Sequence, residues 1–224
     1  MKKYTLFYLL LITLSTFAQR TITKDVGDFS ELKIYDLIEV NLIQSSENKV
    51  IIKGEHSGSV KILNENGKLK IRMEIDERFN GEDTFVEVYF TNISIIDANE
   101  GSKIVANKLI EQNKIELRSQ EGARIKVGIK VNMVIIKAIS GGIVEASGTA
   151  KNQDISINSG GIVEGEELKT EDTTIRITAA GEAEIYVTNN VDAKVTAGGD
   201  IVIYGNPKNV KQKKLAGGDI HFAH

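Results

Sequence analysis

Hydrophobic and polar residues alternate along most of the chain, and in its C-terminal half glycine interrupts the alternation at regular intervals. Successive interruptions are 21, 19, 19, 20, 18 and 19 residues apart. A fixed period of about 19 residues is typical of a repeat architecture. We take one residue of each interruption as the corner of a repeat, and the corners are Gly101, Gly122, Gly141, Gly160, Ala180, Gly198 and Gly217.

Positions on both sides of the corner carry apolar residues at every second place. Small or apolar residues stand five and three places before the corner, and again three and five places after it, with few exceptions. A period of two indicates half-buried strands, whereas a helix would show apolar spacings of three and four. Each repeat therefore predicts two short strands that meet at a bend. The set three places after the corner is Ile104, Ile125, Val144, Val163, Ala183, Ile201 and Ile220.

Repeats of this length predict an all-β fold in which each repeat forms one coil of a parallel β-solenoid. Identical positions of neighbouring coils would then stack about 4.8 Å apart and form columns along the axis. Glycine suits the corners because it adopts left-handed backbone angles at no steric cost. Ala180 lacks that freedom, and we expect Gly181 beside it to supply it instead.

The region from residue 19 to residue 95 is also rich in strand patterns but lacks the glycine schedule. Its apolar runs are separated by turn-like segments such as 64–67 and 80–83. Two organisations fit: irregular coils that continue the solenoid, or a cap that covers the unpaired edge of its first coil. We therefore divide the chain into residues 1–18, 19–95 and 96–224.

Residues 1–18 have the pattern of a secretory signal peptide. Lys2 and Lys3 precede an apolar run of about ten residues, and small residues follow, with cleavage expected after Ala18. The run is short for a membrane anchor, which needs about 20 residues. The chain contains no cysteine, so neither disulfides nor thiolate metal sites are available. We expect an exported protein in the periplasm, on the outer surface or secreted, with no membrane span after cleavage.

The charge balance is mildly acidic. The chain has 28 basic and 31 acidic residues, and loss of the two leader lysines would give a net charge of about −5. The charges look evenly interspersed, without a basic stripe, so we expect no nucleic acid partner. The one local basic cluster, which we interpret as a solvated turn, is Lys208, Lys211, Lys213 and Lys214.

Outward-facing columns provide the candidate binding residues. Solvated like charges about 5 Å apart repel by something like 1 kcal/mol, so stacked carboxylates require an explanation. They fit hydrogen bonding to carbohydrate, a Ca²⁺ site, or simply a charged face that prevents sheet aggregation. No other cofactor is indicated. The candidates are Glu145, Glu164 and Glu184 four places after the corner, Glu182, Asp200 and Asp219 two places after it, and Tyr186 and Tyr204 six places after it.

Catalysis is the competing possibility, because parallel β-helices also host polysaccharide lyases and glycosidases. Glu145 and Glu164 are the carboxylates that could pair for such chemistry. However, the coil spacings vary little, and the sequence shows no insertion that would form a cleft beside them. We therefore expect no enzyme and no catalytic residue.

Several segments resemble the head GIN domain family of auto-transporter adhesins, a domain of unknown function (DUF2807) common in Bacteroidetes. The similar segments are the leader end at 17–19, the opening DFSELKI at 28–34, the following IEVNL at 38–42, and the SGG and AGG corners. The resemblance implies a right-handed parallel β-helix-like fold and export. Together with the columns, it favours a non-enzymatic surface or periplasmic protein that binds a glycan or another protein along a solenoid face. A purely structural envelope component is the other non-enzymatic possibility.

Overall fold

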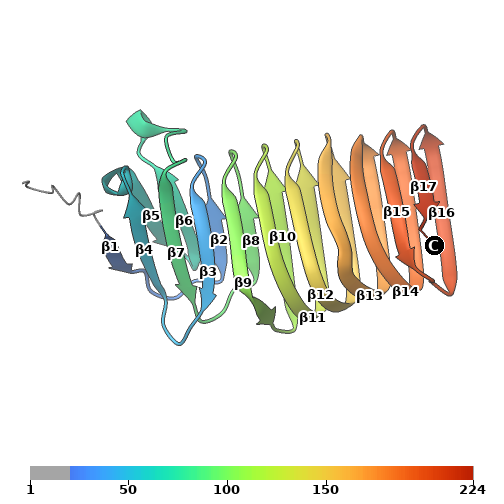
Figure 1. The fold of residues 1–224 in the computed structure, drawn as a ribbon, viewed down its shortest axis with the longest axis horizontal. Helices are drawn as coiled ribbons and strands as arrows, with labels where there is room; N and C mark the ends of the chain where they lie inside the picture. The colour runs from blue at the N-terminus through green and yellow to red at the C-terminus, as the bar shows by residue number, and fades with distance from the viewer. Residues whose placement is uncertain (1–20, 224) are drawn as a thin grey trace, which may run out of the picture.

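The computed structural model describes residues 21–223, so the expected signal peptide lies outside the described residues. The described chain forms one elongated all-β body (Figure 1). The strands are β1 (Ile22–Asp25), β2 (Glu31–Ile34), β3 (Glu39–Gln44), β4 (Lys49–Gly54), β5 (Val60–Glu65), β6 (Lys68–Met73), β7 (Thr84–Phe90), β8 (Ile95–Ala98), β9 (Lys103–Glu111), β10 (Lys114–Gln120), β11 (Arg124–Ile139), β12 (Ile143–Asn158), β13 (Gly161–Ala179), β14 (Gly181–Ala197), β15 (Asp200–Gly205), β16 (Asn209–Ala216) and β17 (Asp219–Phe222), with short 3-10 turns η1 (Ser57–Ser59) and η2 (Ile75–Glu77).

The predicted β-solenoid is confirmed, with the corners and columns in the expected register. Neighbouring coils pair as parallel strands, so that Ile125 pairs with Val144 after the corner and Ile136 with Ile155 before the next one. We call face A the strands that follow a corner, which are β9, β15, β17 and the first halves of β11 to β14. Face B comprises the strands that precede a corner, which are β8, β10, β16 and the second halves of β11 to β14.

The space between the two faces is filled by the alternate apolar residues. Ile104, Ile125, Val144 and Val163 are fully buried, as the period of two requires, and they belong to one continuous core. That core extends without a break into the N-terminal strands, where Leu32 and its neighbours are equally buried.

Each corner consists of two consecutive residues with positive φ. Ser140 (φ 50°) and Gly141 (φ 75°) are typical. At Ala180 the first of the two positions is taken by alanine at φ 50°, as by Ser140, and the second by Gly181 at φ 140°, so Gly181 provides the glycine of this corner as expected. Alanine is tolerated there because the hydrogen bonds between coils, such as that from Ala180 N to Ala197 O at 3.0 Å, hold the corner in place.

A second requirement for glycine lies one place after the corner. A Cβ on Gly142 would lie 2.1 Å from the carbonyl oxygen of Ser119, and a Cβ on Gly161 would lie 2.1 Å from that of Ala138. By contrast, a Cβ on Gly141 would meet no atom within 4 Å. The two glycines of an SGG corner therefore serve different purposes. The first allows the left-handed backbone conformation, and the second allows close approach to the preceding coil.

The bend opposite the corners carries a row of side-chain amides. Asn132 donates from Nδ2 to Asn113 Oδ1 at 2.7 Å, and Asn209 donates to Asn190 Oδ1 at 2.8 Å, while Asn190 in turn donates to Asp172. Such ladders satisfy polar groups along the stacking direction. These residues recur with nearly the same period as the glycines, so the sequence carried a signal for this second bend as well.

The N-terminal strands form coils too, but not in chain order. β2 pairs in parallel with both β6 and β8, and β3 pairs in parallel with both β7 and β9. The β2–β3 coil therefore lies between the β6–β7 coil and the β8–β9 coil, as the blue strands between two green ones show (Figure 1). Its corner uses Asp36 and Leu37, at φ 59° and 63°, in place of glycine.

Antiparallel strands cover the N-terminal end of the solenoid. β4 pairs antiparallel with β7, β5 with β6, and β1 with β4. This change of direction covers the edge of the β6–β7 coil, so the region contains both irregular coils and a cap. The placement of a domain boundary near residue 95 stays a prediction.

Candidate functional site

A groove crosses face A where two strands bulge out of the regular coil. Asn107–Leu109 of β9 stand opposite Gly128 alone, because Ala106 pairs with Val127 and Ile110 with Ile129. In β13, Gly165 pairs with Ile185 but Lys169 with Tyr186, so residues 166–168 have no counterpart in β14. The two bulges border a groove of about 780 Å³. The expectation that no cleft-forming insertion exists is therefore wrong, and the coil spacings of 21 and 20 residues were its signal.

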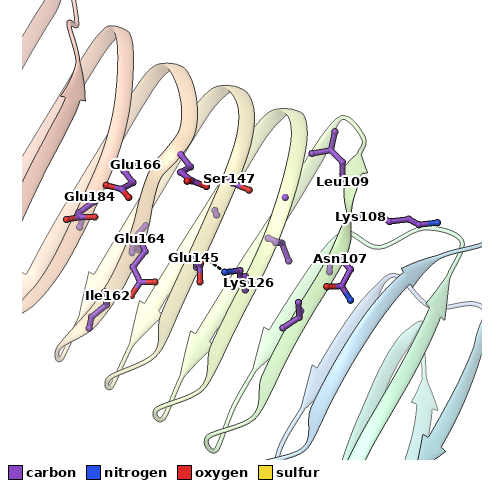
Figure 2. A pocket seen from close by; sticks show the side chains of 18 of the residues that line it. Asn107, Lys108, Leu109, Lys126, Glu145, Ser147, Ile162, Glu164, Glu166 and Glu184 are labelled. Atoms are coloured by element: carbon purple, nitrogen blue, oxygen red, sulfur yellow. Dashed lines mark ion pairs between the residues drawn. The ribbon is translucent and has the colours of Figure 1, made fainter.

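The groove runs along the solenoid axis from β9 to β14. Figure 2 shows Leu109, Ser147 and Glu166 in one row near the bulges and Lys126, Glu145 and Glu164 in a parallel row below. Because these side chains belong to successive coils, a ligand lying along the groove would contact several repeats at once. The remaining lining residues are Val105, Ala106, Asn107, Lys108, Val127, Gly128, Ala146, Ile162, Val163, Glu167, Glu182, Ala183 and Glu184.

The first two carboxylates of the predicted ladder are neutralised within the chain. Lys126 Nζ lies 2.5 Å from Glu145 Oε1, and Arg124 Nη1 lies 3.5 Å from Glu145 Oε2 and 3.2 Å from Glu164 Oε2. The hydrogen bond to Glu145 raises the pKa of Lys126, so that lysine stays charged. This end of the groove is therefore close to neutral and offers both donors and acceptors.

The other end of the groove is acidic. Partial burial, the charges of Glu166 and Glu164, and a hydrogen bond with Glu166 together raise the pKa of Glu184. Desolvation, the charges of Glu184 and Glu166, and a hydrogen bond with Glu166 also raise the pKa of the Tyr204 hydroxyl. Within residues 21–223, neither Glu182 nor Glu184 forms an ion pair with a basic side chain.

The structure brings half of the predicted site residues into the groove. Glu145, Glu164, Glu182 and Glu184 line it, whereas Tyr186 and Tyr204 pair with one another beside it. Asp200 and Asp219 lie in register on later coils, away from the groove. Asp219 instead pairs with Lys214 at 3.0 Å, and that hydrogen bond lowers its pKa. Their role in binding stays a prediction.

Several groove residues were not predicted from the sequence. They are the bulge residues 107–109, Glu166 and Glu167, and also Ser147 of β12. Ser147 stands at the column position of the tyrosines, six places after its corner, where the alignment alone could have drawn attention to it.

Neither a metal centre nor a membrane helix is found in the described part of the chain. Among residues 21–223, no three histidine, aspartate or glutamate side chains are arranged to hold a metal ion, although Ca²⁺ was one explanation for the ladder. Over the same residues, no helix is both long enough and apolar enough to cross a membrane.

Solved structures with the same fold include proteins from Bacteroides and Parabacteroides species. A putative adhesin from Bacteroides fragilis superposes with a TM-score of 0.85 at 14% identity, covering 93% of this chain and 98% of that one. A putative adhesin from Parabacteroides distasonis gives 0.74 at 20% identity, with 92% and 97% coverage. A putative lipid binding protein from the same species gives 0.71 at 15%, with 93% and 98% coverage. Identities this low establish the shared fold alone.

Family membership rests on the sequence itself. No curated protein matches the chain. A family model described as "Putative auto-transporter adhesin, head GIN domain" matches residues 28–207, which include the irregular N-terminal coils as well as the regular ones. The resemblance noted from the sequence segments is thereby confirmed, and the chain belongs to the head GIN domain family of auto-transporter adhesins.

Proposed function

We propose that this protein is an exported, non-enzymatic adhesin-type protein that binds a glycan in the face A groove. One observation carries the proposal: on face A the bulges of β9 and β13 depart from the regular coil, and both border the groove. Bulges are placed features rather than defects, and they commonly re-aim side chains next to binding sites. Family membership supports a role in adhesion.

The groove lining suits hydroxyl-rich ligands. Carboxylates of Glu164 and Glu184 accept hydrogen bonds, Lys126 donates, and the Ser147 hydroxyl does both. Leu109, which is 45% exposed at the end of the groove, offers an apolar surface for the carbon face of a sugar ring. A groove open along the axis would let a chain of sugars lie across several coils.

The electrostatics favour binding over catalysis. A glycosidase needs two carboxyl groups that are free to flank the scissile bond. Glu145 and Glu164, the pair proposed from the sequence, instead share one cation of the chain, because both form ion pairs with Arg124 Nη1. We therefore expect no turnover when the protein is incubated with a broad polysaccharide panel.

A pair of serine variants tests the site. Ser147 lies in the groove on face A, and Ser156 lies on the outer side of face B, so a tryptophan at either place adds the same bulk on opposite sides of the molecule. A glycan array identifies a ligand, and calorimetry then measures its affinity. We expect Ser147→Trp to abolish binding and Ser156→Trp to leave it unchanged. An empty array, or loss of binding in Ser156→Trp alone, would refute the proposal.

A further inference from the structure

Face B carries a column of basic side chains along the length of the solenoid. The in-register strand pairs place Lys70, Lys33, Asp97, Arg118, Lys137, Ser156, Arg176, Lys194 and Lys213 in one outward row. The expectation that the chain has no basic stripe is therefore wrong. From Asp97 onward the row stands four places before each corner, and it is not apparent in the linear sequence because successive members are 18 to 21 residues apart.

The N-terminal half of this row is neutralised within the molecule. Lys33 Nζ lies 3.0 Å from the buried carboxylate of Asp97, and Arg118 and Lys137 both lie 2.8 Å from Glu116. Although partial burial acts in the opposite direction, the hydrogen bonds from these two cations lower the pKa of Glu116. The charged side chains in this half of the row therefore stabilise the fold through ion pairs within the chain.

The C-terminal half is different. Arg176, Lys194 and Lys213 occupy three successive coils, about 4.8 Å apart. Within residues 21–223, none of the three forms a hydrogen bond or ion pair through its side chain. Three stacked cations repel one another, so the row has an electrostatic cost that an external anion would relieve.

The surroundings of the row are mostly polar and follow the same axis. Two places toward the bend lie Asp154, Thr174, Asp192 and Lys211, and Lys211 pairs with Asp192 at 2.9 Å, so within residues 21–223 the Asp154 carboxylate of this flank has no cationic partner. These residues border a shallow groove of about 560 Å³ that runs along the bend and is also lined by Asn152, Asp172 and Asn190. On the corner side the row is flanked by Asn158, Thr178, Thr196 and Leu215, and Leu215 is 56% exposed.

We propose that Arg176, Lys194 and Lys213 bind a linear acidic polysaccharide that lies along the solenoid axis on face B. The carboxylates of successive sugars would pair with cations of successive coils, while the amides and hydroxyls on either side hydrogen-bond the sugar hydroxyls. This site is separate from the face A groove and does not depend on it, because the two lie on opposite sides of the core.

Two features favour a polysaccharide over the other polyanions. Proteins that bind single-stranded nucleic acid combine their basic groove with aromatic side chains on which bases stack, and the positions flanking this row hold none. An anionic membrane is matched by clusters of four to eight cations, often with apolar residues that insert, whereas this row has three free cations, a single exposed apolar neighbour in Leu215, and the Asp192 carboxylate in the adjoining column.

The test uses the described chain and three probes: a linear oligouronate, a neutral glucan of the same length, and a single-stranded oligonucleotide. Affinity is measured by calorimetry at low and at physiological salt. The wild type is expected to bind the oligouronate at low salt, and more weakly at physiological salt because salt screens the charges. It should show no binding of the glucan. Combined substitution Arg176→Gln, Lys194→Gln and Lys213→Gln should weaken binding on the order of tenfold or more.

A matched variant controls for net charge. Lys61→Gln, Lys103→Gln and Lys130→Gln remove three positive charges elsewhere on the surface, and this variant should bind the oligouronate like the wild type. Circular dichroism and thermal melting establish that both triple variants are folded. Ser147→Trp in the face A groove should also leave oligouronate binding intact, so failure of one site is distinguishable from failure of the other.

Four results would overturn the proposal. They are no oligouronate binding by the wild type at low salt, equal affinity for the neutral glucan, equal loss of binding in the control triple variant, and tighter binding of the oligonucleotide than of the oligouronate. The last would assign the row to nucleic acid instead.

Discussion

The N-terminal and C-terminal halves of this solenoid obey the same packing rules but are connected differently. In the regular half, each strand pairs with residues about 19 positions away, as Ile125 does with Val144. In the N-terminal half, Glu39 pairs with both Phe85 and Lys103. The comparison shows that the sequence has a regular period only where successive coils follow one another in chain order. Where a coil is inserted out of order, the coil geometry is the same but the sequence shows no 19-residue period.

The corners show the contrast in detail. In the regular half every corner includes a glycine with positive φ, and the repeated glycine makes the corner recognisable in the sequence. At the corner between β2 and β3, Asp36 and Leu37 adopt the same angles. Asp36 is stabilised there because its buried Oδ2 accepts a hydrogen bond from Met73 N at 3.0 Å. Tertiary contacts thus replace the glycine.

The largest expected effect tests whether the regular half is uniform. Gly142→Ala and Gly161→Ala each place a Cβ 2.1 Å from a backbone oxygen of the preceding coil, so each should cost about 3 kcal/mol or prevent folding. Gly141→Ala, with φ 75° but open space around it, should cost only about 1 kcal/mol. Urea unfolding measures all three. Similar costs at 141 and 142 would contradict the division of roles between the two glycines.

The next effect tests the junction between the halves. Asp97 is 1% exposed, lies 3.0 Å from Lys33 Nζ of the inserted coil, and accepts a hydrogen bond from Asn99 Nδ2 at 3.0 Å. Asp97→Ala leaves the poorly solvated ammonium group of Lys33 without its partner. The free energy of unfolding should therefore fall by about 3 kcal/mol. In the regular half, Asp192→Ala removes the exposed pair with Lys211 and should cost less than about 1 kcal/mol. If Asp97→Ala and Asp192→Ala lower the free energy of urea unfolding equally, the Asp97 ion pair does not stabilise the junction more than an exposed ion pair does.

A smaller effect concerns the one corner of the regular half without glycine at its usual place. Ala180 has φ 50°, a conformation that costs a residue with a Cβ about 1 kcal/mol. Ala180→Gly relieves that strain but makes the unfolded chain more flexible, so a net gain of roughly 0.5 kcal/mol is expected. Differential scanning calorimetry should show a slightly higher Tm. A lower Tm would mean that the alanine methyl makes a contact worth more than the strain.

The smallest effect is a pH dependence in the acidic end of the groove. The pKa of Glu184 is raised by burial and by Glu166 and Glu164, so its protonated form is favoured on folding. Its contribution to stability is therefore fully present below the ordinary glutamate pKa and is lost as pH rises through the raised value. Glu184→Gln should raise Tm relative to the wild type at neutral pH and by less at pH 4. A Tm difference that does not change with pH would show that the carboxylates do not interact.

The sequence was sufficient for the regular coils and their columns because period and burial coincide there. It placed Glu145 and Glu164 in one column, and strand pairing confirms that register. It did not predict the groove, since a bulge of two or three residues changes a coil spacing by only one or two. The Arg176–Lys194–Lys213 row was not predicted either, because its members are 18 and 19 residues apart and form a row only when the coils are stacked.

The out-of-order coil has a consequence for biogenesis. Strands β2 and β3 come early in the chain, yet the hydrogen bond from Ser102 Oγ to Ile34 O joins residues 68 positions apart. A chain that emerges from its N-terminus during synthesis or export therefore carries β2 and β3 without parallel partners until β6 and β7 arrive, and with one edge still open until β8 and β9 arrive. Each regular coil, by contrast, can pair as soon as the next repeat of about 19 residues has emerged. Assembly of this protein is thus limited at its beginning, and the later coils are added one by one onto a template that the first hundred residues must complete together.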